Sequence, residues 1–160
     1  MKKAAPRIGI ISDTHGLLRP EALKALRGVD HILHAGDVGE PSILDALRAI
    51  APVTAIRGNI DVGGPCSHLP DTEVVTLHGR TFYMLHDRSA LDLDPAAAGF
   101  AAVIFGHSHR PAIDWRNGVL YMNPGSAGPR RFSLPISLGL LTIHDGLMEP
   151  ELVPLHPASA

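Results

Sequence analysis

Residues 7–16 read Arg-Ile-Gly-Ile-Ile-Ser-Asp-Thr-His-Gly. The apolar run Ile8–Ile11 predicts a buried strand, and polar side chains crowd together directly after it at positions 12–16. In open α/β sheets, ligands bind outside the carboxyl ends of the strands, where loops converge. Asp13 and His15 are two residues apart in an extended segment, so both side chains leave on the same side. A carboxylate and an imidazole on one face can share a divalent metal ion.

Length and composition limit the classes of protein to consider. A chain of 160 residues suffices for a single domain over residues 1–160 with one hydrophobic core. Because aromatic residues make up only 4%, we expect that core to consist of Leu, Ile, Val and Ala. The formal net charge of -2 offers no cationic footprint for nucleic acid, so we expect no long DNA or RNA partner. Short or cyclic nucleotides stay open.

Cysteine content and hydropathy bear on location. Cys66 is the only cysteine, which excludes an internal disulfide framework and a thiolate cage for a metal. Lys2 and Lys3 are followed by no signal-peptide core, and no apolar run approaches the ~20 residues of a membrane span. We therefore expect a soluble, cytoplasmic protein that binds no membrane.

Strands and helices alternate in the first half of the chain. Residues 19–28 and 41–50 have the apolar spacing of amphipathic helices, and each carries a proline in its first turn. Residues 31–35 and 53–56 read as short buried strands between them. This alternation is typical of parallel βαβ units.

The second half has a different pattern. Hairpins are predicted around residues 78–80, at Asn117-Gly118 and at Asp145-Gly146, with a buried strand at 101–105 and a short Ala-rich helix capped by Asp94. We therefore predict an α/β fold of two packed mixed β-sheets flanked by helices, an αββα sandwich.

Residues that can bind metal follow five of the predicted strands. A single His or Asp at such a place is typical of a turn or a cap, but five strand ends are hard to explain in that way. Nitrogen and oxygen donors without sulfur suit Mn, Fe, Zn, Ni or Co, and their number favours two ions ~3.5–4 Å apart, bridged by one carboxylate. The candidates are Asp13, His15, Asp37, Asn59, His86, His107 and His109.

These motifs, in this order, resemble the signature of the calcineurin-like metallophosphoesterase superfamily, in particular its small bacterial and archaeal phosphodiesterases. The residues are Asp13-x-His15, Gly36-Asp37, Gly58-Asn59-x-Asp61, His86 and Gly106-His107-Ser108-His109. The likeness extends from Ile8 to the region of Arg130 and includes residues 123–126, Asn-Pro-Gly-Ser. The resemblance implies the same two-sheet fold and hydrolysis of a phosphate ester by a metal-bound hydroxide.

The resemblance also implies roles for individual residues. Asp13, His15 and His109 would hold one ion, and Asn59, His86 and His107 would hold the second. Asp37 would bridge the two ions, and Asp37, Asn59 and His107 would be catalytic. Manganese is the first expectation for both ions, with iron, zinc, nickel and cobalt open. Two divalent ions exceed the charge of two carboxylates, so the site would attract a phosphate anion.

Ile60 and Asp87 depart from the family pattern. Many family members carry a histidine at the place of Ile60, where it can protonate the leaving group. Without a side-chain acid there, phosphodiesters are the expected substrates. Asp87 stands where the family often has glycine, and either contacts a ligand histidine or caps a turn.

Further points stay as expectations. Asp61 is expected to support the Asn59 turn, and His34 is interpreted as a satisfied core histidine. Arg130 either meets the substrate phosphate or orders its loop. The alternative functions are a phosphomonoesterase and a non-catalytic protein-interaction scaffold, as in the small retromer subunit that this family resembles, although a scaffold predicts eroded ligands. We expect a small phosphoester partner, while the natural substrate and the oligomeric state, including a homo-oligomer, stay open.

Overall fold

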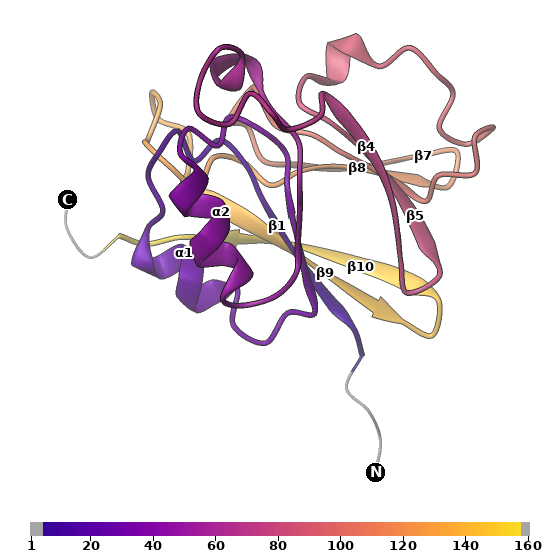
Figure 1. The fold of residues 1–160 in the computed structure, drawn as a ribbon. Coiled ribbons are helices and arrows are strands. Elements are labelled where there is room, and N and C mark those ends of the chain that lie inside the picture. Colours follow the sequence, from indigo (N-terminus) through magenta and orange to yellow (C-terminus); the bar gives the residue numbers. More distant parts are fainter. Residues whose placement is uncertain (1–4, 158–160) are drawn as a thin grey trace.

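Two five-stranded β-sheets form the centre of the structure, a computed structural model that describes residues 5–157 (Figure 1). Residues 1–4 and 158–160, the ends of the expected domain, lie outside the described residues. The elements in chain order are β1 (Arg7–Ile11), α1 (Pro20–Ala25), β2 (His31–His34), α2 (Pro41–Arg48), β3 (Val53–Ala55), the 3₁₀ turn η1 (Asn59–Asp61), β4 (Thr72–Leu77), β5 (Arg80–Leu85), the 3₁₀ turn η2 (Arg88–Ala90), β6 (Ala102–Ile104), β7 (Ala112–Arg116), β8 (Val119–Asn123), β9 (Ser137–His144) and β10 (Leu147–Pro154).

Sheet A has the strand order β10-β9-β1-β2-β3, and its last three strands are parallel. Ile10 of β1 lies opposite Leu33 of β2, so the carboxyl ends of these strands share one edge of the sheet. This confirms the predicted βαβ units. The β9-β10 hairpin returns from the end of the chain and pairs antiparallel with β1, which leaves β1 in the middle of the sheet.

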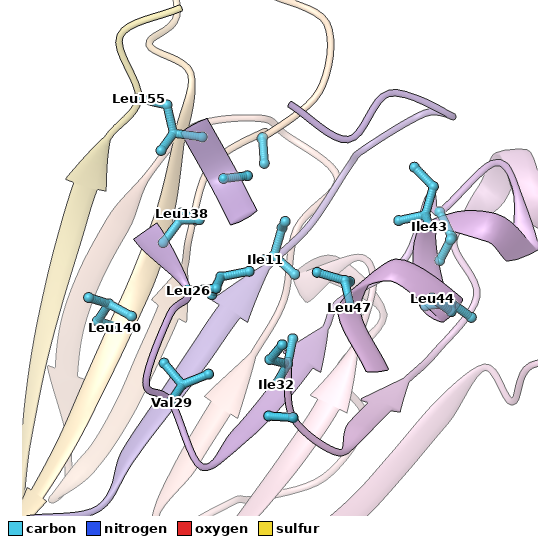
Figure 2. Close-up of a cluster of buried hydrophobic side chains, with 14 of the residues drawn as sticks. Ile11, Leu26, Val29, Ile32, Ile43, Leu44, Leu47, Leu138, Leu140 and Leu155 are labelled. Atoms are coloured by element: carbon cyan, nitrogen blue, oxygen red, sulfur yellow. The ribbon is translucent and has the colours of Figure 1, made fainter. Parts of the chain in front are cut away.

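Helices α1 and α2 cover the outer face of sheet A (Figure 1, Figure 2). Ile11 of β1 packs there with Leu26, which follows α1, and with Leu47 of α2. The alternate residues of β1, Ile8 and Ile10, face the second sheet instead. Because both faces of β1 are buried, its sequence is an apolar run rather than an alternation.

Sheet B has the strand order β4-β5-β6-β8-β7 and mixes parallel with antiparallel pairs. Its inner face meets sheet A through fully buried side chains that include Phe82, Ile104 and Met122. The fold class predicted from the sequence, two packed mixed sheets, is confirmed.

The predicted Ala-rich helix after Asp94 is wrong. Its cap is present, since Asp94 Oδ1 accepts the N–H of Ala96 at 3.1 Å. However, Gly99 takes a left-handed φ of 81° and the N–H of Phe100 returns to the carbonyl of Pro95, so the chain stops after a single turn. In the described chain the outer face of sheet B is therefore covered by turns, and the α-helices lie over sheet A alone.

The three predicted hairpin turns are confirmed. Each is a pair of residues with positive φ, the pattern of a type I′ turn: 50° and 78° at His78-Gly79, 51° and 77° at Asn117-Gly118, and 50° and 79° at Asp145-Gly146. Among residues 5–157, none of the helices is long and apolar enough to cross a membrane.

Packing between the sheets predicts one effect on stability. Phe82 is fully buried there, so Phe82→Ala should lower the free energy of unfolding by about 3–5 kcal/mol. Val74 on the neighbouring strand is 51% exposed, and Val74→Ala should change that free energy by less than about 0.5 kcal/mol. Urea unfolding checks both variants, and equal losses would contradict this description of the core.

Candidate metal centre

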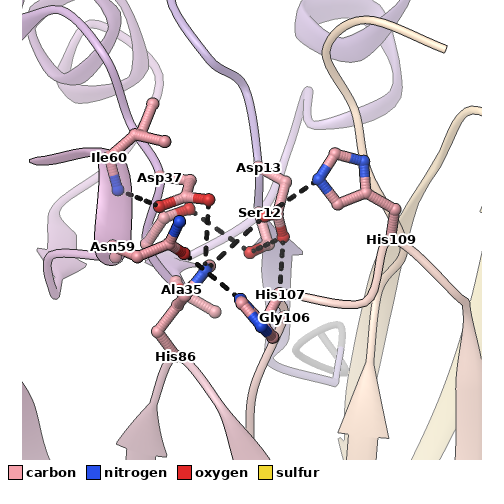
Figure 3. A network of polar contacts seen from close by, with 12 residues as sticks. Ser12, Asp13, Ala35, Asp37, Asn59, Ile60, His86, Gly106, His107 and His109 are labelled. Atoms are coloured by element: carbon pink, nitrogen blue, oxygen red, sulfur yellow. Dashed lines mark hydrogen bonds and ion pairs between the residues drawn. The ribbon is translucent and has the colours of Figure 1, made fainter. Parts of the chain in front are cut away.

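All seven predicted site residues come together at one end of the two sheets. Figure 3 shows the network around Asp13 and Asp37. Three loops leave sheet A, after β1, β2 and β3, and two leave sheet B, after β5 and β6. Backbone hydrogen bonds join these loops, including Asp13 N–H to the Gly36 carbonyl at 2.9 Å and Gly106 N–H to the His86 carbonyl at 3.0 Å. The convergence that the strand-end pattern predicted is therefore present.

Asp13 lies at the centre of the cluster and is fully buried. Its Oδ2 accepts hydrogen bonds from Ser12 Oγ at 2.7 Å and from the N–H of His107 at 3.1 Å. Its Oδ1 lies 3.3 Å from Nε2 of His109, 3.7 Å from Nε2 of His15 and 3.8 Å from Nε2 of His86. One carboxylate oxygen is thus held by its neighbour Ser12 and by the loop after β6, and the other oxygen faces three imidazoles.

Asp37 has the same division of its two oxygens. Its Oδ1 accepts the N–H of Ile60 at 3.0 Å, while Oδ2 lies 3.2 Å from Nε2 of His86 and 3.4 Å from Nε2 of His15. The Nδ1–H of His86 donates to the carbonyl of Ala35 at 2.7 Å, so its Nε2 is the free nitrogen of the neutral ring. His86 Nε2 is therefore oriented as a metal ligand.

The cluster leaves polar atoms without partners. Among the described residues, three buried side-chain atoms lack a hydrogen bond: Asp13 Oδ1, His86 Nε2 and His109 Nδ1. A buried atom left in this way costs about 1–3 kcal/mol, which coordination to a cation would offset. Because Asp13 Oδ1 and His86 Nε2 also face the other donors, the residues present fit a divalent metal.

The donors form two groups, Asp13 with His15 and His109, and Asp13 with Asp37 and His86. Within each group the ligand atoms lie within 4.8 Å of one another. Asp13 belongs to both groups, and Asp37 Oδ2 faces a histidine of each. Asp13 and Asp37 thus each face donors of both groups, whereas the family resemblance gave the shared position to Asp37 alone.

Asn59 and His107 lie at the open side of the cluster. Asn59 Oδ1 is 3.2 Å from Nδ1 of His107, and the ring of His107 meets that of His86 edge to face at 5.2 Å. The His107 side chain is 45% exposed, against 7% for His86. These two residues are thus the most exposed of the seven candidate donors.

Charge within the cluster shifts two pKa values. Burial opposes ionisation of Asp13, but the close imidazoles of His109, His15 and His86 hold the pKa of Asp13 well below its usual range. Burial favours neutral His86, but its contact with Asp37 and the charge of Asp13 raise the pKa of His86 above its ordinary value. Both shifts reflect carboxylates that attract positive charge.

The backbone of the site is held in an unusual conformation. Five of the seven candidates have left-handed φ values: 55° at Asp13, 47° at His15, 56° at Asp37, 71° at His107 and 61° at His109. Residues other than glycine rarely adopt this region, and such strain concentrates at functional sites. Most of the other left-handed residues besides glycine belong to the hairpin turns.

Glycines of the motifs let the loops approach each other. A Cβ atom on Gly58 would collide with the carboxylate of Asp37, and one on Gly106 would collide with Ser12 and Asp13. The glycine before Asn59 and the glycine before His107 are therefore required by close contact between loops.

Asp61 joins two of the loops. It is fully buried, and its carboxylate accepts N–H groups of Gly58 at 2.9 Å, Gly39 at 3.0 Å and Val38 at 3.1 Å. These donors flank Asn59 and Asp37 in the sequence. Asp61 thus positions two candidate ligands. The sequence predicted its support of the Asn59 turn, and its bonds to Val38 and Gly39 extend this support to the loop of Asp37.

His34 joins the loops of β1 and β2. Its Nε2–H donates to Thr14 Oγ1 at 3.0 Å, Thr14 donates to the Val38 carbonyl at 2.8 Å, and the N–H of Gly36 donates to His34 Nδ1 at 3.1 Å. The sequence reasoning missed Ser12 and Thr14, although their places beside Asp13 were the available signal. Burial lowers the pKa of His34 to about 4, so the ring stays neutral.

The two residues of open role, Asp87 and Arg130, have different surroundings. Asp87 Oδ1 accepts the N–H and the hydroxyl of Ser89 at 3.0 and 2.8 Å, so Asp87 caps η2. Its Oδ2 lies 3.8 Å from His107 Nε2, beyond hydrogen-bond distance. Within residues 5–157, Arg130 makes no side-chain hydrogen bond or ion pair, and its loop is tied down by the bond from Arg19 Nε to the Gly128 carbonyl at 3.1 Å.

Comparison with known proteins gives a consistent result. Residues 7–146 match the family model of the calcineurin-like phosphoesterase superfamily domain. A protein of Methanocaldococcus jannaschii named probable metallophosphoesterase is 36% identical, with 92% of this chain and 81% of the relative covered. The phosphodiesterase YfcE of Escherichia coli is 27% identical, with 81% and 84% covered.

Solved structures show the same fold. An archaeal phosphodiesterase superposes with a TM-score of 0.78 at 24% identity and covers 93% of this chain and 99% of its own. Vacuolar Protein Sorting 29 from Cryptosporidium parvum gives a TM-score of 0.74 at 18% identity and covers 96% and 99%.

The Asp61 bonds predict a loss of metal affinity from a residue outside the donor set. In Asp61→Asn an amide group faces backbone N–H donors, which should cost about 2–3 kcal/mol of stability and lower zinc affinity at least ~10-fold. Urea unfolding and zinc calorimetry measure the two effects. Asp45→Asn, an exposed carboxylate on α2, is the matched control and should be neutral. Unchanged zinc affinity in Asp61→Asn would contradict the positioning role.

The neutral His34 ring predicts a dependence of stability on pH. Above the ordinary pKa of 6.5 the ring is neutral in both states, whereas between 6.5 and about 4 only the unfolded chain binds the proton. Stability is therefore lost as the pH falls through this window. Metal-free wild type should lose about 3 kcal/mol more than His34→Gln between about pH 7.5 and about pH 4. Parallel losses in urea unfolding of the two proteins would exclude this role of His34.

Proposed function

Because the chain belongs to the calcineurin-like phosphoesterase superfamily, we propose that it hydrolyses phosphodiesters with two divalent ions held by the clustered donors. Family membership supports phosphoester hydrolysis in general. The more specific proposal depends on one observation: the unpaired Asp13 Oδ1 and His86 Nε2, together with Asp37 Oδ2, face the same space within the cluster. A convergent set of carboxylate and imidazole donors of this kind fits divalent cations.

The donors divide naturally between two ions. Asp13, His15 and His109 would hold one, and Asp37, His86, Asn59 and His107 would hold the other, with Asp13 or Asp37 shared. When bound, such ions would polarise the phosphoryl group, lower the pKa of water and give the site a net positive charge that attracts phosphate. Manganese is the metal that we expect first. Iron, zinc, nickel and cobalt stay open, because imidazole and carboxylate donors without sulfur suit all five metals.

Protein groups then determine where the substrate binds and which leaving groups can depart. Asn59 and His107 stand at the open side, where they can contact a phosphate oxygen, and we propose catalytic roles for them and for Asp37. Ile60 is 41% exposed beside Asp37 and has no proton to donate. A leaving group that needs no side-chain acid, such as an aryloxide, is therefore favoured.

The relatives support the same choice of substrate. The Escherichia coli relative is named a phosphodiesterase. The scaffold alternative is favoured by the likeness to Vacuolar Protein Sorting 29, but that likeness concerns the fold. The complete donor set, with its strained backbone, supports an enzyme instead, because a scaffold has no need of unpaired buried ligands. We also propose a cytoplasmic location, which suits a chain with one cysteine.

Kinetics on two substrate classes test the proposal. Without an acid at Ile60, the manganese-loaded protein should cleave bis(p-nitrophenyl) phosphate with a kcat/KM at least ~100-fold above that for an alkyl monoester such as glycerol phosphate. Asp37→Asn, which keeps an oxygen for the Ile60 N–H but removes the charge, should lose at least ~100-fold of the diesterase activity and so exclude a contaminating enzyme. A higher kcat/KM on the alkyl monoester would overturn the choice of diesters.

A further inference from the structure

A pocket of about 300 Å³ opens directly beside the candidate metal centre, and we call it the side pocket. At one end it is lined by Asn59, His86 and His107, three of the candidate donors. From there it runs between the loop after β3, the end of β5, η2 and the start of β4. A substrate with its phosphorus at the metal centre can therefore extend an ester group into this space.

Apolar side chains line the side pocket beyond the donors. Leu85 at the end of β5 is 3% exposed, and Val62 and Ala90 contribute further apolar surface from the loops after β3 and β5. The volume lies at the small end of the usual range for ligand pockets, about 300–1,000 Å³. It suits a single ring better than an extended chain.

The charged groups of the side pocket are unsuited to a second anion. Arg57 is the only Lys or Arg among its lining residues, and its guanidinium is already engaged. Arg57 Nε donates to Asp71 Oδ1 at 2.6 Å, Nη2 to Asp71 Oδ2 at 3.3 Å, and Nη1 to the carbonyl of Ser67 at 3.0 Å. Asp87 adds a further carboxylate to the lining. A second phosphate placed here would meet paired or negative groups.

We propose that the side pocket binds an uncharged aromatic ester group of the phosphodiester substrate. The inference rests on the proposed function, because it assumes that the phosphate lies at the metal centre. Two independent observations lead to the same group. The lining accepts an apolar ring and disfavours an anion, and Ile60 leaves the departing oxygen without an acid, which suits an aryloxide. The substrate class is thus an aryl phosphodiester.

Binding of two stable analogues tests the proposal without turnover. Dimethylphosphinate and methylphenylphosphinate are both monoanions with two P–C bonds, so neither is hydrolysed, and they differ only in that a phenyl ring replaces one methyl group. Calorimetry on the zinc-loaded protein should show methylphenylphosphinate binding at least ~10-fold more tightly, because its ring leaves water for the side pocket. In Ala90→Phe, which fills the pocket, this ratio should fall to about one. Ala97→Phe adds the same ring at an exposed place outside the pocket and should keep the wild-type ratio.

Each outcome has a distinct meaning. If neither phosphinate binds, the proposed function itself fails. If both bind equally to the wild type, the phosphoester site stands and the aromatic assignment is overturned. If Ala90→Phe keeps the wild-type ratio of affinities for the two phosphinates, the aromatic assignment is also overturned, because the phenyl ring must then bind outside the side pocket. Should Ala90→Phe not fold, Val62→Trp narrows the same pocket at a position that is 62% exposed and carries the same expectation.

Discussion

Two buried carboxylates, each aimed at the same small space, are the constraint on which the rest of the site depends. Asp13 is fully buried and Asp37 is 2% exposed, and each has one oxygen fixed by a backbone amide and the other facing histidine nitrogens. Like charges held so closely in a low-dielectric interior are costly unless cations balance them. The left-handed backbone at both residues and the absence of a Cβ at Gly58 and Gly106 make the arrangement possible. A bound divalent cation would balance the negative charge that these two carboxylates hold together.

The two-sheet architecture explains how such a cluster can be rigid. Asp13, Asp37 and Asn59 follow strands of sheet A, whereas the loops that carry His86, His107 and His109 leave sheet B. The hydrogen bond from the N–H of His107 to Asp13 Oδ2 joins the sheets across 94 positions of sequence. Because the sheets are held by a continuous apolar core, the donors stay in register without help from flexible segments. Asp61 and His34 fix the loops within sheet A in the same way, by bonds to backbone groups.

Local pattern predicted much of this structure. The βαβ units, the three type I′ turns and the convergence of five strand ends follow from periodicity, turn residues and the geometry of parallel strands. Most of what the sequence reasoning missed depends on contacts between distant segments, and one error, the Ala-rich helix, is local. The turn at Asp94 has a helix cap, yet Gly99 ends it after one turn, and the sequence reasoning did not place β9 beside β1. Tertiary structure also decides that Asp13 is shared between two donor groups and that Arg57 pairs with Asp71. No rule of sequence spacing specifies which carboxylate oxygen stays free of a partner.

The central claim is that these donors hold two divalent ions between Asp13 and Asp37. Anomalous X-ray diffraction from crystals soaked in manganese tests it directly. We expect two peaks ~3.5–4 Å apart, one against Asp13, His15 and His109 and one against Asp37 and His86, with a carboxylate between them. A single peak, or manganese bound away from the two carboxylates, would contradict the account.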